Sequence, residues 1–359
     1  MIEHLNYSSV LAGFTISFAI CLLIVATKMG RNGMGVDHTE GIQKFHRVPT
    51  PRIGGVGLMA GFLVTWWLLK GEAKEITGWM VFSGFLVFIF GLAEDFSNRV
   101  SPGVRLLATL MAGVVFCLVS GVSVTNVSLW WLDHFLESPY FAIAFTAFAL
   151  ATASNAINII DGFHGLASGT ILIMLVAIAI VTMKVGDTAL LAVILSLAAV
   201  TVGFFIVNFP FGKIFLGDGG AYFLGFTIAA ITVLMPARTP ELTPWICLLI
   251  LSYPLTEVLV SVVRKTWTKQ HHPGRPDNLH LHMLVYRLVS RKMNTSKGGN
   301  IINHVITSMI LWLFPFVSLL LTTISNFDSQ FVIRSIFAVF FAYLAIYRIA
   351  HYFDRTYHS

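Results

Sequence analysis

The chain has 359 residues, of which 56% are hydrophobic and only 11% are charged, and its formal net charge is +6. Soluble domains contain about 25% charged residues, so this composition excludes an ordinary soluble protein. We expect no nucleic-acid partner, because the sequence offers no soluble basic domain to carry one. The positive charge instead suits anionic lipid or phosphate ligands.

Apolar segments of about 20 residues predict membrane-spanning helices. We therefore expect an all-α, polytopic transmembrane helical bundle in the lipid bilayer. It would form a single domain over residues 1–359, with a larger cytosolic loop at 264–300. Eleven spans are predicted, at 9–27, 53–69, 78–93, 104–122, 139–158, 166–184, 188–208, 220–236, 244–263, 301–324 and 330–348.

The distribution of basic residues predicts the orientation. No Lys or Arg precedes the first span, whereas Lys28 and Arg31 follow it. Basic residues concentrate on the cytosolic side of membrane proteins, which places the N-terminus outside. Alternation from there puts 18 of the 23 Lys and Arg residues on the inner side and the C-terminus in the cytosol.

The first inner loop combines cationic side chains with a shaped turn. Lys44, His46, Arg47 and Arg52 lie within nine residues, and the prolines and paired glycines around 49–55 indicate a defined turn. Such a loop could clamp a phosphate or pyrophosphate. It could equally anchor lipid headgroups.

The second inner loop begins with the adjacent acids Glu94 and Asp95. Two carboxylates at a helix end could bind Mg²⁺, act as a base, or do both. A salt bridge to Arg99 or Arg105 is the simpler alternative.

A polar cluster separates two long apolar runs in the middle of the chain. It contains Asn155, Asn158, Asp161 and His164 with two glycines. Polar groups are costly in or near hydrocarbon, so this cluster indicates a functional site. The alternative is a helix cap followed by a glycine turn, with the asparagines bonding neighbouring helices.

Asp218 lies among three glycines at the expected start of another helix. Glycines allow a ligand to approach the backbone closely, and a carboxylate with open space beside it suits Mg²⁺. Asp218 could also be an ordinary helix N-cap.

The longest inner loop carries four histidines (His271, His272, His280 and His282) and Arg275. The loop contains no cysteine and its spacing matches no standard zinc pattern. Histidine and arginine donors to phosphate oxygens are the better interpretation. All these polar motifs fall on the predicted cytosolic side, which indicates one composite site for a metal and a phosphorylated, nucleotide-like ligand.

In these motifs the chain resembles the polyprenyl-phosphate N-acetylhexosamine-1-phosphate transferases. This family of integral membrane enzymes includes phospho-MurNAc-pentapeptide translocases and UDP-GlcNAc:undecaprenyl-phosphate GlcNAc-1-phosphate transferases. Five motifs follow the family's order between about residues 41 and 290: Pro51–Gly55, Glu94–Asp95, Asn155–Leu166, Gly217–Gly220 and His280–His282.

The resemblance implies an enzyme that transfers a sugar-1-phosphate from a UDP-N-acetylhexosamine to undecaprenyl phosphate and releases UMP. It implies Mg²⁺, with Mn²⁺ as an alternative cofactor, and a bacterial inner-membrane location. The expected role is to initiate a cell-envelope glycan such as O-antigen. A homodimer is compatible with the sequence.

The resemblance also implies roles for individual residues. Asp218 would be the principal metal ligand, with Asp161 beside the metal and the nucleotide. Asp95, with Glu94, would be the base or part of the metal site.

The remaining matched residues would contact the substrates. His280 and His282 would contact the diphosphate, and Lys44 and His46 the phosphates. Asn155 and Asn158 would shape the nucleotide pocket, and Glu257 matches an acidic position of the family.

Three positions depart from the family pattern. Glu94 replaces the usual Asp, His164 replaces an acid, and Met283 stands where another His is common. The change at His164 favours a deoxy or otherwise modified N-acetylhexosamine.

A transporter of a phosphorylated or anionic solute is the main alternative function. It would place polar groups near the bilayer midplane, often in repeated halves, and we find no clear repeat. A CDP-alcohol phosphatidyltransferase is disfavoured, because Asp161-Gly162 is followed by Phe163-His164 and no further acid before Asp187.

Overall fold

The computed structural model describes residues 7–27, 36–37, 49–268, 279–293 and 301–356. Nearly all of them are helical, which confirms the all-α class. In chain order the helices are α1 (Tyr7–Ala26), α2 (Gly55–Leu68), α3 (Gly71–Ser97), α4 (Pro102–Ser120), α5 (Trp130–Leu136), α6 (Pro139–Ile160), α7 (Leu166–Val185), α8 (Thr188–Asn208), α9 (Gly217–Arg238), α10 (Trp245–Ile250), α11 (Ser252–Thr268), α12 (Leu281–Lys292), α13 (Ile301–Leu311), α14 (Leu313–Ile324) and α15 (Ser329–Thr356).

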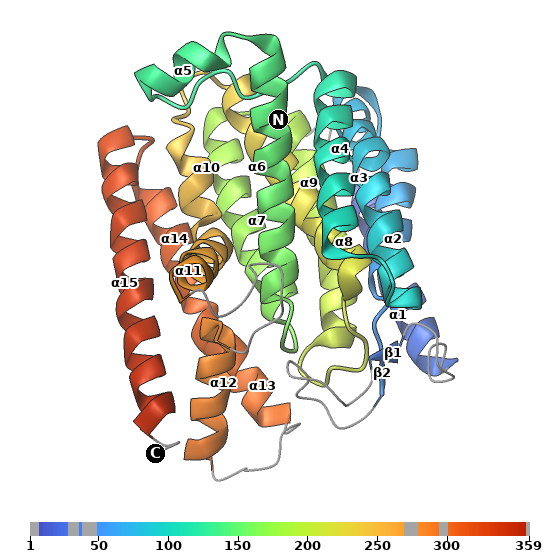
Figure 1. The fold of residues 1–359 in the computed structure, drawn as a ribbon. Helices are drawn as coiled ribbons and strands as arrows, with labels where there is room; N and C mark the ends of the chain where they lie inside the picture. Colours follow the sequence, from blue (N-terminus) through green and yellow to red (C-terminus); the bar gives the residue numbers. More distant parts are fainter. Residues whose placement is uncertain (1–6, 28–35, 38–48, 269–278, 294–300, 357–359) are drawn as a thin grey trace.

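Nine of the described helices are long and apolar enough to cross a membrane, with α13 and α14 counted together as 301–324. The apolar helix α2 is shorter, at 14 residues. Most of the long helices run side by side along one axis (Figure 1). The protein is therefore a polytopic membrane helical bundle. The count of eleven spans stays a prediction.

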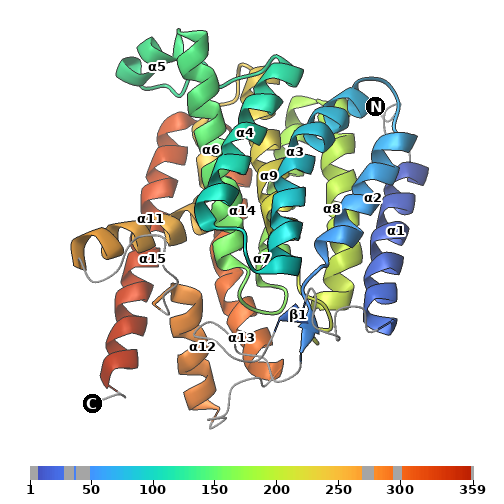
Figure 2. The same cartoon turned by 45° about the vertical axis from the view of Figure 1, so that its right-hand side comes forward.

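The predicted span 244–263 is not one continuous helix. It is divided into α10 and α11, and α11 lies across the bundle axis (Figure 2). Pro254, in the first turn of α11, has no N–H to donate to the carbonyl of Ile250, so the helical ladder is interrupted there.

Helix α9 forms the centre of the bundle. Of its most apolar 18-residue stretch, 83% is buried, against 28% in both α1 and α15. It packs mainly against α3 and α6. The first turn of α9 is therefore surrounded by the ends of other helices.

The two ends of the bundle differ. At one end lie α12, α13 and the antiparallel pair β1 (Val36–Asp37) and β2 (Thr50–Pro51), and we call this the α12 end (Figure 1). At the opposite end lies α5, and we call this the α5 end. Helix α1 begins at the α5 end and α15 finishes at the α12 end, as an odd number of crossings requires (Figure 2).

Candidate active site

The loop that precedes α2 pairs with the loop that precedes α9. The N–H of Gly54 donates to the carbonyl of Phe215 at 2.9 Å, and the N–H of Phe215 donates to the carbonyl of Pro51 at 2.8 Å. These bonds join the motif at residues 51–55 to the segment directly before the motif at 217–220, although the two are distant in sequence.

Asp95, near the end of α3, holds the first turn of α9. Its carboxylate accepts hydrogen bonds from the backbone N–H groups of Asp218 (2.8 Å) and Gly219 (2.9 Å). It also accepts from Nε of Arg52 at 3.0 Å, and Asp95 is only 1% exposed. The first N–H groups of a helix lack partners within it, so an anion there satisfies them. These contacts support a positioning role for Asp95.

Asp218, the second residue of α9, lies between two guanidinium groups. Its Oδ1 accepts from Nδ2 of Asn158 at 3.0 Å and lies 3.4 Å from Nη2 of Arg52. Its Oδ2 accepts from Nη1 of Arg105. Two carboxylates (Asp95 and Asp218) thus face two cations. The Asp218 side chain is 13% exposed, so this carboxylate can be reached by a ligand.

Arg105 comes from the first turn of α4 and has donor capacity to spare. Its guanidinium carbon lies 5.9 Å from the centre of the Tyr222 ring, and its buried Nε has no hydrogen-bond partner among the described residues. A guanidinium group with an unused N–H beside a reachable carboxylate is suited to binding a phosphate oxygen.

Glycines let the backbones approach closely around Asp218. Gly217 has φ +73°, and a Cβ there would collide with the carbonyl of Arg52 and the carboxylate of Asp95. A Cβ on Gly91 of α3 would lie 2.6 Å from the Cα of Gly219. Larger residues at these positions would push α3 and the loop before α2 away from α9.

The end of α6 brings the polar cluster of the central motif to the same place. Asn158 reaches Asp218 directly, as described above, and Oδ1 of Asn155 accepts from the hydroxyl of Tyr222 at 3.1 Å. Asp161 ends α6, one turn beyond Asn158, with its N–H 3.3 Å from the carbonyl of that residue. The predicted grouping of Asn155, Asn158 and Asp218 is therefore present in the structure.

Glu94 closes the turn that follows α3. Its Oε2 accepts from the N–H of Val100 at 2.7 Å. This contact supports a local structural role. Its predicted role as a base or metal ligand is untested.

His280 and His282 form a buried cluster with Glu257 of α11. Each Nδ1 lies near Oε1 of Glu257, at 3.4 Å from His280 and 3.1 Å from His282. The three sets of ligand atoms lie within 4.8 Å of one another, a spacing that a metal could use. The hydroxyl of Tyr343 donates to Oε2 of Glu257 at 2.7 Å, so the carboxylate is already well hydrogen-bonded.

His164 is buried, with 6% of the residue exposed. Its Nδ1 lies 3.0 Å from the carbonyl oxygen of Pro210, and its ring stacks on His304 with 4.0 Å between the ring centres. These contacts support a packing role. The predicted contact with substrate is untested, and the predicted substrate-binding residues Lys44, His46 and Arg275 lie outside the described residues.

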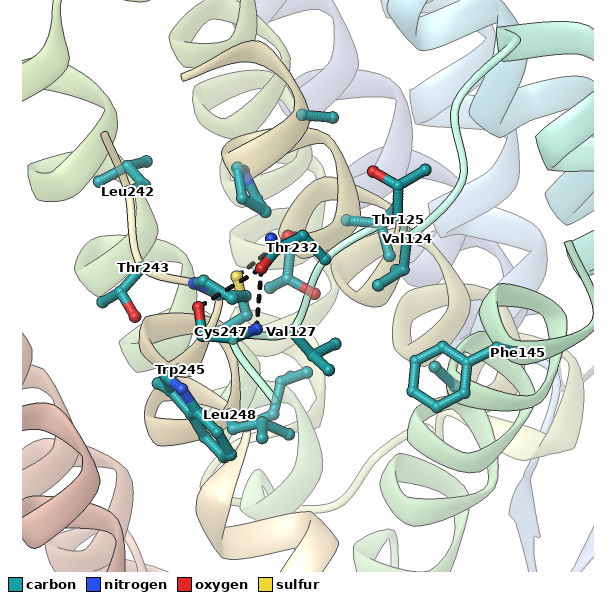
Figure 3. A pocket seen from close by; sticks show the side chains of 18 of the residues that line it. Val124, Thr125, Val127, Phe145, Thr232, Leu242, Thr243, Trp245, Cys247 and Leu248 are labelled. Atoms are coloured by element: carbon teal, nitrogen blue, oxygen red, sulfur yellow. Dashed lines mark hydrogen bonds between the residues drawn. The ribbon is translucent and has the colours of Figure 1, made fainter. Parts of the chain in front are cut away.

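A cavity of about 970 Å³ lies nearer the α5 end, between segment 123–129, α6, α9 and α10. Figure 3 shows mainly apolar side chains around it, among them Phe145, Trp245 and Leu248. Its wall on α6 reaches Ala153, five residues before Asn158. At a rise of 1.5 Å per residue this is about 7.5 Å along the helix.

A family model described as glycosyl transferase family 4 matches residues 78–236. A putative UDP-N-acetylglucosamine–dolichyl-phosphate N-acetylglucosaminephosphotransferase from Sulfolobus acidocaldarius is 30% identical over 234 residues, which are 63% of this chain and 70% of that protein. This chain belongs to glycosyl transferase family 4. The stretch matched by the family 4 model contains Asp95, Arg105, Asn158 and Asp218.

Two further relatives extend the comparison. A probable undecaprenyl-phosphate N-acetylglucosaminyl 1-phosphate transferase from Bacillus subtilis (strain 168) is 28% identical over 320 residues, 86% of this chain and 82% of that protein. A phospho-N-acetylmuramoyl-pentapeptide-transferase from Streptococcus pneumoniae (strain CGSP14) is 29% identical over 235 residues, 63% of this chain and 71% of that protein. The resemblance seen in the sequence is confirmed, and the transporter alternative receives no support.

The sequence named three further residues of the site without their partners. Arg105 was expected as a salt-bridge partner of Glu94 or Asp95, and the structure pairs it with Asp218. Arg52 was one of several cations in its loop, and only the fold shows that it joins Asp95 to Asp218. Glu257 was matched to an acidic position of the family, and its contact with the histidines depends on how α11 packs against α12.

Proposed function

We propose that this family 4 protein transfers an N-acetylhexosamine 1-phosphate from a UDP-sugar to a polyprenyl phosphate and releases UMP. The observation that carries the proposal is the cluster of Asp218, Asn158, Arg52 and Arg105 at the first turn of α9. It combines a reachable carboxylate with two phosphate-binding cations at one end of a membrane bundle.

The names of the relatives support this reaction class. Two of those described are named for moving N-acetylglucosamine phosphate to undecaprenyl or dolichyl phosphate, and the third for moving a phospho-N-acetylmuramoyl-pentapeptide. A polyprenyl or dolichyl phosphate appears in the first two names and a phosphorylated N-acetyl amino sugar is common to all three. We therefore assign these two classes of substrate, with undecaprenyl phosphate as the acceptor and a bacterial inner membrane as the location.

The donor set fits a divalent metal. Asp218 and Asp161 offer carboxylate oxygens, the ligands that Mg²⁺ and Mn²⁺ prefer. Asn158 lies one turn before Asp161 on α6 and donates to Asp218. We propose that Asp218 and Asp161 hold the metal. When bound, the metal would neutralise charge on the diphosphate.

The chain's own residues would orient the substrates for a direct displacement. An oxygen of the lipid phosphate attacks the β-phosphorus of the UDP-sugar, the bond to the bridging oxygen breaks, and UMP leaves with the electron pair. Phosphoryl transfer depends mostly on positioning and charge stabilisation. Arg52 and Arg105 would bind phosphate oxygens, and Asp95 would keep Asp218 in place.

The apolar cavity gives the lipid acceptor a route to the site. Its α6 wall leads toward Asn158, so an isoprenoid tail lying there would bring its phosphate to the α12 end. We place this end on the cytosolic side, where UDP-sugars are available.

The test is UMP release by the purified protein, supplied with undecaprenyl phosphate and a panel of UDP-N-acetylhexosamines. We expect release that requires both the lipid and Mg²⁺ or Mn²⁺, and the fastest donor identifies the sugar. Omission of the lipid is the matched control. Release without lipid would indicate a hydrolase, and no release with any donor from folded protein would contradict the proposal.

A further inference from the structure

Glu257 is the centre of a buried hydrogen-bond cluster between α11, α12 and α15. Its Oε1 accepts from the N–H of Leu281 at 2.9 Å and faces Nδ1 of both His280 and His282. Its Oε2 accepts from the hydroxyl of Tyr343. Glu257 is 1% exposed, so solvent does not reach these bonds.

A carboxylate that is ionised can only accept hydrogen bonds, so the imidazole of His282, whose Nδ1 lies 3.1 Å from Oε1, presents Nδ1–H. Which nitrogen of a histidine carries the proton is set by the bond that the other nitrogen makes. Nε2 is then the ring nitrogen of His282 that can contact a phosphate oxygen.

The geometry shows where one Nε2 points. A Cβ added to Gly162 would lie 3.4 Å from Nε2 and Cδ2 of His282. Gly162 directly follows Asp161, a proposed metal ligand. The rings of His280 and His282 lie 5.3 Å apart with an interplanar angle of 19°. The Nε2 edge of His282 therefore faces the turn at the end of α6.

We propose that Glu257 is a positioning residue of the reaction. It fixes the ring orientation and the Nδ1–H form of His282, so that Nε2 is presented to the phosphate groups of the UDP-sugar. The proposal rests on the proposed function, because it assigns His282 to the same substrate.

The alternative is that Glu257 only docks α12, and the chain offers a matched control for it. Asp354 of α15 also docks α12, through ion pairs with Arg287 at 2.8 Å and Arg291 at 3.1 Å. Asp354 is likewise buried, at 6% exposure, but none of these contacts involves a histidine. A docking defect alone should therefore appear in both variants.

The experiment is a double-mutant cycle on the full-length protein, with kcat and KM for the UDP-sugar and the thermal unfolding midpoint measured for every variant. The variants are Glu257→Gln, His282→Gln, the double variant and Asp354→Asn. Loss of the carboxylate that orients a catalytic histidine can cost up to about 10⁴-fold in kcat in a well-studied hydrolase. We expect at least a tenfold fall in kcat for Glu257→Gln and for His282→Gln.

The decisive result is coupling between the two positions. If Glu257 acts through His282, the double variant is no slower than the slower single variant. Asp354→Asn should lower the unfolding midpoint while kcat stays near the wild-type value. Independent effects that multiply in the double variant, or a matching fall in kcat for Asp354→Asn, would overturn the proposal.

Two further measurements keep the cycle interpretable. If Glu257→Gln does not fold, the same cycle is run with Glu257→Asp, which keeps the charge but shortens its reach; wild-type kcat in that variant would also overturn the proposal. If the wild-type protein releases no UMP, the proposed function itself fails, and that outcome is separate from a lack of coupling.

Discussion

The two ends of the bundle use the same ion-pair chemistry for different purposes. At the α5 end, Arg238 pairs with Asp187 at 2.6 Å and with Glu72 at 2.7 Å. At the α12 end, Arg52 and Arg105 pair with Asp95 and Asp218. Both clusters join helix ends that are distant in sequence.

The difference lies in what surrounds the charges. At the α5 end, Asp187 also caps α8 through the N–H of Leu190 at 3.0 Å, so its oxygens are taken up by structural contacts. Of the two acids in the cluster at the α12 end, Asp95 is used in this way, whereas Asp218 lies beside the amide of Asn158 and the guanidinium of Arg105, whose Nε has no hydrogen-bond partner among the described residues. The side chains of Asp218 and Asp187 are similarly exposed, at 13% and 11%. Ion pairs and exposure therefore do not distinguish the two ends, and the unused donor beside Asp218 does.

The largest expected effect distinguishes Asp218 from the carboxylates that serve structure. Asp218→Asn keeps the shape and one acceptor oxygen but removes the charge that would hold the metal. We expect UMP release to fall by about 10²–10³-fold, the scale seen when one preorganised stabilising group is lost. The unfolding midpoint should change little, and near-wild-type turnover would remove Asp218 from the metal site.

A smaller loss is expected at Arg105, whose counterpart at the α5 end is Arg238. A hydrogen bond to a charged group contributes about 1.5–3 kcal/mol, so Arg105→Gln should lower kcat/KM for the UDP-sugar about 10- to 100-fold. Arg105→Lys keeps the charge but lacks the planar guanidinium with its several N–H donors. Its kcat/KM should therefore lie between those of the wild type and Arg105→Gln. Equal rates for all three proteins would exclude phosphate binding by Arg105.

Asp95 and Asp187 form a matched pair for the comparison. Substitution by Asn removes the negative charge at either position. In Asp95→Asn the new side-chain NH₂ also faces a backbone N–H at the start of α9, so two donors oppose each other there. We expect Asp95→Asn to lower both the unfolding midpoint and kcat, the latter about tenfold, since a misplaced charge-assisted contact is worth about 1.5 kcal/mol. Asp187→Asn should lower the midpoint alone. A fall in kcat for Asp187→Asn would show that the two ends are not separate in function.

The smallest effect is a pH dependence at the α5 end. Burial would raise the pKa of Asp187, but the bonds from Arg238 and the N–H of Leu190 outweigh it and hold the pKa below the ordinary value of 3.8. A carboxyl group with a lowered pKa stabilises the fold above its unfolded pKa, and this contribution is lost as the pH falls through the folded pKa. The unfolding midpoints of wild type and Asp187→Asn should therefore differ at neutral pH and converge below about pH 4. A constant difference down to pH 2 would contradict this.

The sequence predicted the membrane bundle and the motifs that meet at the α12 end, because long apolar runs and clustered polar groups are local signals. It did not predict the break between α10 and α11 at Leu251, because the mean hydropathy of a long window hardly changes with the single residue Pro254. The pairing of Arg52 with Asp95 and of Glu257 with the histidines depends on contacts between helices far apart in sequence. The sequence also did not predict whether Asp95 contacts a ligand or only the backbone of α9, because both roles require an acidic residue at this position.

The most direct measurement follows the two phosphorus atoms of a UDP-N-acetylhexosamine that is separately labelled at the α- or the β-phosphate. The proposed reaction predicts that the β label appears in the lipid phase, joined to undecaprenyl phosphate, while the α label appears in UMP. Asp218→Asn should slow the appearance of both labelled products by about 10²–10³-fold. A β label that stays in the aqueous phase as UDP or phosphate while the sugar moves to the lipid would contradict the proposed reaction.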